Sequence, residues 1–187
     1  MQFSRVVSFF FVLLTFGVFA LAVPAQRAAS PADIIPILTN LKSEILPILS
    51  QITSTVASGN ATSDSIAPLV DGIVADIHAA ASSLQGLSTK RSLETLEKRQ
   101  SVDDVATLVA SIIEDITPPL NNLLGDAASI PDLGSLLGGM DTSMDDLLNG
   151  LEMLLPGILT FVANLLIDVA GSLESLALGL TLSSLGL

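Results

Sequence analysis

Residues able to perform acid–base or nucleophilic catalysis are scarce in this sequence. The chain of 187 residues has one histidine, His78, no cysteine and only seven lysines and arginines. Such catalysis usually depends on His, Cys, a perturbed Lys or paired carboxylates. His78 lies four residues after Val74, at the margin of an apolar helical face, so we interpret it as a boundary residue. No histidine follows Arg99. The sequence therefore predicts no catalytic residue and no enzyme activity.

Acidic pairs are the remaining candidates for ligand chemistry, at residues 103–104, 114–115 and 145–146. A calcium site needs roughly six to eight oxygens that converge from a flexible loop. Two of these pairs follow expected helix starts and one lies on an expected solvent face, so capping and solubility explain them better. Phosphate-binding glycine loops and His-Glu-x-x-His patterns are absent from the sequence. We expect no metal and no cofactor, and the net charge of −12 makes nucleic acid an unsuitable partner.

Three stretches of the chain have the apolar spacing of amphipathic helices. Isoleucine, leucine and valine recur every three or four residues over residues 34–52, 66–84 and 102–116, as expected for helices with one buried face. Pro36 and Pro47 interrupt the first of these stripes. No stretch alternates as a strand would, so the sequence predicts helices and no sheet.

Serines followed by acidic residues mark the expected helix starts. Ser30, Ser101 and Ser143 each precede carboxylates, and a fourth start is expected near Ser63. Such serines cap free backbone N–H groups, and carboxylates in a first turn suit the helix dipole. The glycine-rich residues 125–140 are expected to form a loop.

After residues 1–22, the most apolar part of the chain lies between Leu147 and Leu180. Its apolar side chains cover more of the helix circumference than a surface helix needs, so this helix must be buried, paired or placed at an interface. The seam that we expect to act as an adhesive face consists of Leu148, Leu151, Leu155, Ile158, Val162, Leu165, Val169 and Leu176. The sequence thus predicts an all-α fold, a small bundle of about four to five amphipathic helices with a strongly apolar C-terminal helix.

This C-terminal helix is not expected to cross a membrane. Its longest uncharged run, Met153 to Ile167, has 15 residues, whereas a transmembrane helix needs ~20 apolar residues. Glu152 and Asp168 close the run, and no basic residue anchors it.

Residues 1–22 have the layout of a secretory signal peptide. A lone Arg5 precedes an apolar stretch, and the small residues Ala20 and Ala22 stand where signal peptidase would cut. We therefore expect cleavage after Ala22 and a secreted protein. In the secretory pathway, Asn60 of the sequon Asn60-Ala61-Thr62 is expected to be glycosylated.

Four of the seven basic residues form two dibasic pairs, Lys90-Arg91 and Lys98-Arg99. In a secreted chain this arrangement resembles cleavage sites for a kexin-type protease, and an exposed charged linker is the simpler alternative. The expected parts of the chain are a signal peptide (1–22), an N-terminal helical unit (23–87), a dibasic processing linker (88–99) and a C-terminal acidic, apolar helical unit (100–187).

The two helical units show a faint internal similarity. A shift of 71 residues places Asp33 on Asp104, Glu44 on Asp115, Ile45 on Ile116, Pro47 on Pro118 and Leu49 on Leu120. Helical periodicity alone can produce matches among apolar positions, so the shift is only a hint of two related units.

With these features together, the chain resembles a family of small secreted structural proteins of mushroom-forming fungi. The resemblance rests on the signal peptide, the junction Leu96-Glu97-Lys98-Arg99-Gln100, the cysteine-free body and the Leu- and Gly-rich end from Leu147 to Leu187. Proteins of that family act beside hydrophobins in cell walls and extracellular matrix, and they help aerial hyphae to form and attach. The resemblance implies a location in the cell wall or matrix, and it carries over no catalytic residue. Helical hydrophobic-surface-binding proteins of fungi would imply similar physics.

These observations favour a non-enzymatic structural or surface-active protein. It would adsorb to, or assemble at, hydrophobic surfaces or the cell wall, with itself as a further partner. Two alternatives stay open: an extracellular carrier whose helices enclose a lipid, and a kexin-processed effector released as residues 100–187. Because carboxylates without counter-charges repel one another, assembly is expected to strengthen as the pH falls toward ~4.

Overall fold

The structure is a computed structural model, and it describes residues 31–87 and 98–187. These residues form helices and contain no strand, which confirms the all-α fold class. The long helices are α2 (Pro31–Ala57), α3 (Ser63–Leu87), α4 (Lys98–Gly125) and α5 (Leu133–Leu154). The shorter elements are the helices α6 (Ile158–Leu166), α7 (Ala170–Ser175) and α8 (Gly179–Leu185), with 3₁₀ turns η1 (Ala127–Ser129) and η2 (Ile167–Val169). The helices are more numerous than expected because the chain after α5 is divided into short pieces.

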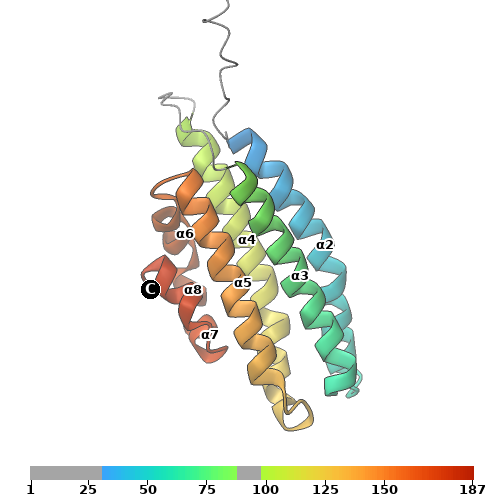
Figure 1. Cartoon of the computed structure of the whole chain (residues 1–187). Coiled ribbons are helices and arrows are strands. Elements are labelled where there is room, and N and C mark those ends of the chain that lie inside the picture. The colour runs from blue at the N-terminus through green and yellow to red at the C-terminus, as the bar shows by residue number, and fades with distance from the viewer. Residues whose placement is uncertain (1–30, 88–97) are drawn as a thin grey trace, which may run out of the picture.

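The four long helices pack side by side as a bundle (Figure 1). α2 contacts both α3 and α4, and α3 also contacts α5. The chain runs downward in α2 and α4 and upward in α3 and α5 as Figure 1 is drawn. The neighbouring pairs α2–α4 and α3–α5 are therefore parallel, and the two helices that the 71-residue shift aligns, α2 and α4, lie next to each other.

The predicted apolar stripes form the inner faces of α2, α3 and α4. In α2 the buried side chains are Pro31 and the stripe residues Ile34, Leu38, Leu41, Ile45, Leu49 and Ile52. Pro36 and Pro47 lie inside α2 without ending it. Both prolines are exposed, so water can satisfy the carbonyl groups that a proline leaves without an N–H partner.

The turn from α2 to α3 uses local hydrogen bonds to start the second helix. Gly59 adopts a left-handed conformation with φ +68°, which glycine accepts at little cost. Ser65 Oγ then accepts a hydrogen bond from the Thr62 N–H at 2.9 Å, an arrangement like a capping box. The helix start expected near Ser63 is confirmed, although Ser65 rather than Ser63 makes this bond.

Two other expected helix starts are wrong. α4 begins at Lys98, three residues before Ser101, and the strong helix propensity of Lys, Arg and Gln favours this extension. α5 begins at Leu133, so most of the expected loop 125–140 is helical and Ser143 lies within the helix. The reason is burial, because Leu137, Met140 and Met144 continue the apolar stripe of α5, and packing overrides the weak helix propensity of the glycines.

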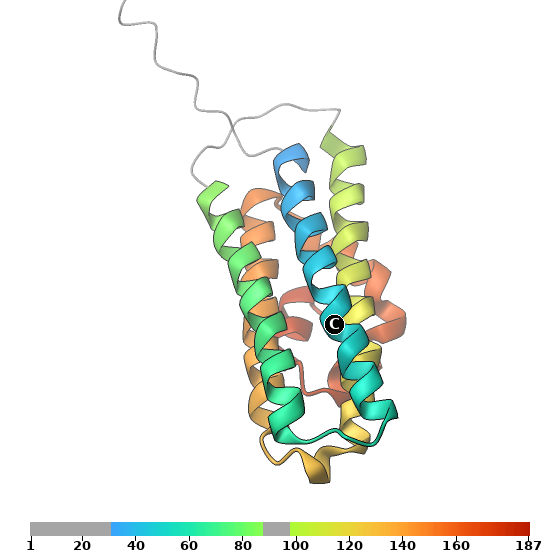
Figure 2. The same cartoon turned by 90° about the vertical axis from the view of Figure 1, so that its right-hand side faces the viewer.

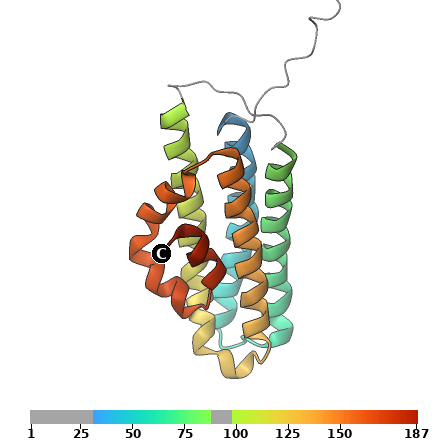
Figure 3. The same cartoon turned by 60° about the vertical axis from the view of Figure 1, so that its left-hand side comes forward.

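The expected single C-terminal helix is also wrong, since helix α5 ends at Leu154 and shorter helices follow. Pro156 offers no N–H to the helix, and Gly157 after it adopts φ +91°, which is outside the helical region. Residues 155–187, here called the C-terminal segment, form a second layer against one side of the bundle (Figure 3). Within this layer α6 packs on α4, and α8 packs on α5.

All described parts of the chain contribute to one hydrophobic core. Its fully buried members include Leu38 from α2, Ile77 from α3, Leu120 from α4 and Leu151 from α5. Leu176 and other residues of the C-terminal segment complete the same cluster. The two helical units expected from the sequence therefore share a single core.

Candidate functional surface

Helix α6 is apolar on its buried face and also on part of its exposed face. Ile158, Val162 and Leu166 are fully buried against the bundle. Phe161 and Leu165, four residues apart and hence on one face, are 49% and 47% exposed. A helix of a single soluble bundle needs only one apolar stripe, so the outer face of α6 requires another explanation.

The exposed apolar side chains are concentrated at the end of the chain. Among the described residues, the exposed large hydrophobic side chains are Leu46, Met153, Phe161, Leu165, Ile167, Leu180 and Leu187. All except Leu46 lie from position 153 onward, and Met153 is the most exposed at 70%. The C-terminal segment carries only two charged side chains, Asp168 and Glu174. We call this set without Leu46 the apolar surface.

The structure corrects the position of the adhesive face expected from the sequence. Leu148, Leu151, Ile158, Val162 and Leu176 are at most 1% exposed, and Leu155 is also buried. Val169 is half-buried, and only Leu165 of the expected seam is exposed. The expected seam presupposes one continuous helix, whereas the break after Leu154 turns most of it into the core.

Two acidic side chains of α5 anchor the C-terminal segment through backbone N–H groups. Glu152 accepts hydrogen bonds from the N–H groups of Gly157 at 2.7 Å and Leu159 at 3.3 Å. Asp141 accepts from the N–H groups of Leu180 and Thr181, each at 2.9 Å. Carboxylates at helix N-termini satisfy free N–H groups and suit the helix dipole, so α5 fixes the starts of α6 and α8.

The anchor at α8 is buried and has further contacts. Asp141, only 6% exposed, also accepts a hydrogen bond from the Thr181 hydroxyl at 2.8 Å. One turn further along α5, Asp145 accepts hydrogen bonds from the hydroxyl of Ser184 and from the Asn149 side chain. Both acids therefore hold α8 against α5.

Sequence analysis missed Asp141, although the sequence contains a signal. Asp141 lies four residues after Leu137 and three before Met144, within the buried stripe of α5. A carboxylate at such a position must have partners, because burying an unpaired charge is costly. The identity of those partners, about forty residues further along the chain, required the structure.

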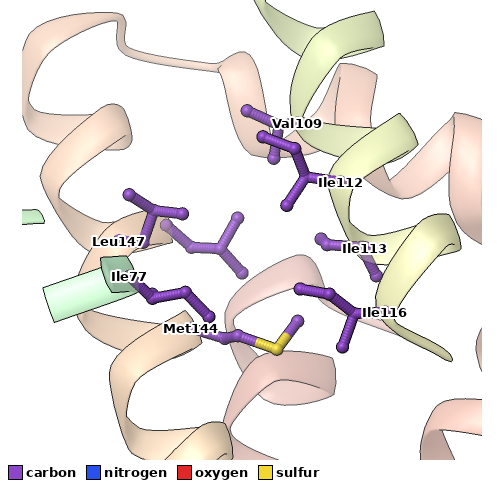
Figure 4. A pocket seen from close by; sticks show the side chains of 8 residues that line it. Ile77, Val109, Ile112, Ile113, Ile116, Met144 and Leu147 are labelled. Carbon is purple, nitrogen blue, oxygen red and sulfur yellow. The ribbon is translucent and has the colours of Figure 1, made fainter. Parts of the chain in front are cut away.

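The bundle interior has a small cavity among its aliphatic side chains (Figure 4). Ile77 of α3, four isoleucine and valine side chains of α4, and Met144 of α5 are among the residues that line it. The centre of a water-sized sphere can occupy about 10 Å³ of this cavity, which is room for about one water molecule. Typical sites for drug-sized ligands have ~300 Å³ or more, so this cavity does not hold a lipid in this conformation.

Of the predicted processing residues, only Lys98 and Arg99 are described, and they lie at the opposite end of the bundle from the glycosylation site Asn60. Ala22, Lys90 and Arg91 are outside the described residues, and Lys98 and Arg99 form the first turn of α4. Asn60 is exposed in the turn between α2 and α3, at the bottom of Figure 1, where its side chain donates to Ser58 Oγ at 3.1 Å. Both modifications stay predictions.

The polar candidates from the sequence are not brought together into a site. His78 is exposed on α3. Within residues 31–87 and 98–187, no group of three or more His, Asp or Glu side chains is placed to hold a metal ion. One window, Ile158–Ser175, is long and apolar enough to cross a membrane by length and composition. In the bundle this window comprises α6, η2 and α7, and its composition alone is weak support for a membrane span.

Comparison with protein-family models and with curated proteins finds no match for this chain.

Proposed function

We propose that this is a secreted, non-enzymatic, surface-active protein that adsorbs to hydrophobic surfaces through its apolar surface. The observation that carries the proposal is the concentration of exposed apolar side chains from Met153 onward, in a region with only two charged residues after position 154. Exposed apolar side chains that lie on one helix face, as Phe161 and Leu165 do on α6, are candidates for an interaction site.

Simple energetics support adsorption through these side chains. Removing a few hundred Å² of apolar surface from water contributes several kcal/mol at ~25 cal/mol per Å². Phe161 and Leu165 can contribute without any unfolding because both are already about half exposed. The exposed acidic side chains of α2 and α3, the two long helices on the far side of the bundle from the C-terminal segment, would then keep the coated face hydrophilic.

The same structure gives less support to a lipid carrier. A carrier needs an interior volume for an acyl chain or a sterol, and the cavity among α3, α4 and α5 has room for about one water. Adsorption of the closed bundle requires no such volume. Cell-wall or extracellular-matrix localisation, as the family resemblance implies, would place the protein where hydrophobic surfaces meet water.

A pair of matched variants tests the proposal. The double variant Phe161→Ser with Leu165→Ser should reduce the amount adsorbed on a Teflon sheet after washing several-fold, and the water contact angle of the sheet should fall less than with the natural sequence. The control is Leu46→Ser on α2, since Leu46 is similarly exposed at 43% but lies outside the apolar surface.

Circular dichroism of all three proteins shows whether the helical fold is intact. If the double variant folds and still adsorbs as strongly as the Leu46→Ser control, the apolar surface is not the adsorbing face and the proposal fails.

A further inference from the structure

Helices α2 and α3 connect to α4 through a short segment, residues 88–97, and α3 ends at the same end of the bundle at which α4 begins (Figure 2). The two dibasic pairs lie at 90–91 and 98–99. We propose that cleavage at these pairs leaves one folded protein made of two non-covalently bound chains and does not release residues 100–187. The inference does not depend on the proposed function.

The main packing contacts of the bundle join helices from opposite sides of the cleavage region. α3 packs along α5, and α2 packs along α4. Each of these pairs combines one helix from before residue 88 with one from after residue 97. Within each of these pairs, the two helices contact each other more extensively than α2 contacts α3. A cut in the connection therefore leaves the largest helix–helix contacts unchanged.

The side chains at these contacts are apolar and buried. Ile77 of α3 faces Ile113 of α4 and Leu147 of α5 around the small cavity (Figure 4). Near the upper end of α3, a Cβ atom placed on Gly150 of α5 would lie 3.8 Å from the Cβ of Leu84. Both positions are buried, so separation of the two chains would expose them to water, which is unfavourable.

Lys42 adds a polar contact across the same interface. Its Nζ lies 2.9 Å from Asp115 Oδ2 on α4 and donates a hydrogen bond to Ser111 Oγ at 3.0 Å. The Lys42 and Asp115 side chains are 29% and 36% exposed, so solvent weakens their attraction. The contact joins the turn of α2 at Lys42 to the turn of α4 at Ser111 and Asp115.

A covalent connection between two parts raises the effective concentration of one part around the other, to about 1 mM for a short linker. Once the connection is cut, the two chains stay together at micromolar protein concentration only if their dissociation constant is below that micromolar value. A shared core of fully buried aliphatic side chains from α2, α3, α4 and α5 is typical of such obligate interfaces.

Cleavage of the intact secreted chain tests the inference. The purified protein is treated with a kexin-type protease, or, if that enzyme leaves it whole, carries an inserted site for another sequence-specific protease within residues 88–97. After cutting, the two helical pieces should elute together from a sizing column at about 1 µM, close to the mass of the uncut protein, because cutting at both pairs removes only residues 92–99. They should separate only in denaturant. Separate elution in native buffer, or loss of helical circular dichroism on cutting, would overturn the inference and favour a released effector.

Matched glycine variants test the packing between the two chains. Gly150→Leu places a side chain between α5 and Leu84, so the cut protein should separate at concentrations at least about tenfold higher than the natural sequence does. Gly138→Leu is the control, because Gly138 is exposed on the same helix and a Cβ atom placed on it would meet no atom within 4 Å. Equal behaviour of the two cut variants would contradict the inference.

A charge exchange provides a second readout that does not depend on the core. Lys42→Glu should raise the concentration at which the cut chains separate by a few-fold. Adding Asp115→Lys should restore it, since the attraction is re-formed with the charges exchanged. If the double variant separates no less readily than Lys42→Glu, the contact seen between α2 and α4 does not join the cut chains.

Discussion

Asp141 illustrates how one side chain connects distant parts of this protein. Its carboxylate accepts three hydrogen bonds from Leu180 and Thr181, while Asp141 itself sits in the buried stripe of α5. The first N–H groups of α8 have no carbonyl groups of a preceding turn as acceptors, and the Asp141 carboxylate accepts their hydrogen bonds instead. A residue that interrupts an apolar stripe thus determines where the end of the chain docks.

We predict that Asp141→Ala lowers the free energy of unfolding by about 2 kcal/mol or more, because it removes three bonds to a charged acceptor and leaves buried N–H groups without partners. Urea denaturation followed by circular dichroism measures this change. Hydrogen exchange should show the largest loss of protection in α8.

The control for this prediction is Asp146→Ala, which makes the same change of charge on the same helix. It should alter the unfolding free energy by less than about 0.5 kcal/mol. If the two variants are equally stable, the contact between Asp141 and α8 is not present in solution.

At the scale of elements, α5 differs most from the prediction, because its glycine-rich first part was expected to be a loop and is helical. Gly138 is exposed within the helix, and a Cβ there would meet no atom within 4 Å. We predict that Gly138→Ala raises the unfolding free energy by about 0.5–1 kcal/mol, since alanine favours the helix and reduces the entropy of the unfolded chain. Thermal and urea denaturation measure the change.

Gly157 gives the opposite expectation at the break that follows α5. Its φ of +91° is strained for any residue with a Cβ, so Gly157→Ala should destabilise the protein by about 1 kcal/mol or more. A stabilising Gly157→Ala, or a neutral Gly138→Ala, would mean that the helix ends elsewhere.

The apolar stripes explain why the long helices were predictable. The spacing from Ile34 to Ile52 and from Ile66 to Leu84 placed α2 and α3 correctly, because one buried face dominates the energy of such helices. The start of α5 was not predictable from local signals. The glycine content indicates a loop there and Ser143 indicates a later helix start, and only the packed structure shows that Leu137 and Met140 are core residues.

The candidate surface was only partly predictable for a related reason. The sequence indicates that residues after Leu147 are too apolar for a surface helix, which identifies the region. The sequence does not indicate which side of each short helix faces the bundle, because the long helix ends just before Pro156. Exposed Phe161 and Leu165 and buried Val162 lie within four residues of one another, and the orientation of α6 on α4 alone separates them.

For the molecule as a whole, charge opposes assembly. The net charge is −12, and neighbouring copies on a coated surface would repel one another. We predict that the amount adsorbed at saturation increases as the pH is lowered from 7 toward ~4, where carboxylates in general lose their charge. A quartz microbalance with an alkane-coated surface measures the adsorbed mass.

Salt provides an independent check of that explanation. At pH 7, raising the ionic strength from ~0.01 M to ~0.15 M shortens the Debye length from about 30 Å to about 8 Å. Adsorption should then increase without any protonation. If acid increases adsorption but salt does not, the pH effect has a cause other than repulsion between copies.

The parallel pairing of α2 with α4 and of α3 with α5 also bears on how the chain acquires its structure during synthesis. The α2–α3 hairpin closes through a short turn and can form quickly. Its contacts with α4 and α5, however, can form only after those helices have been synthesised. A ribosome therefore releases the first hairpin with its apolar face uncovered until α4 and α5 emerge. Chaperone binding in that interval is expected to favour residues 34–84, the part of the chain that is synthesised first among the described helices.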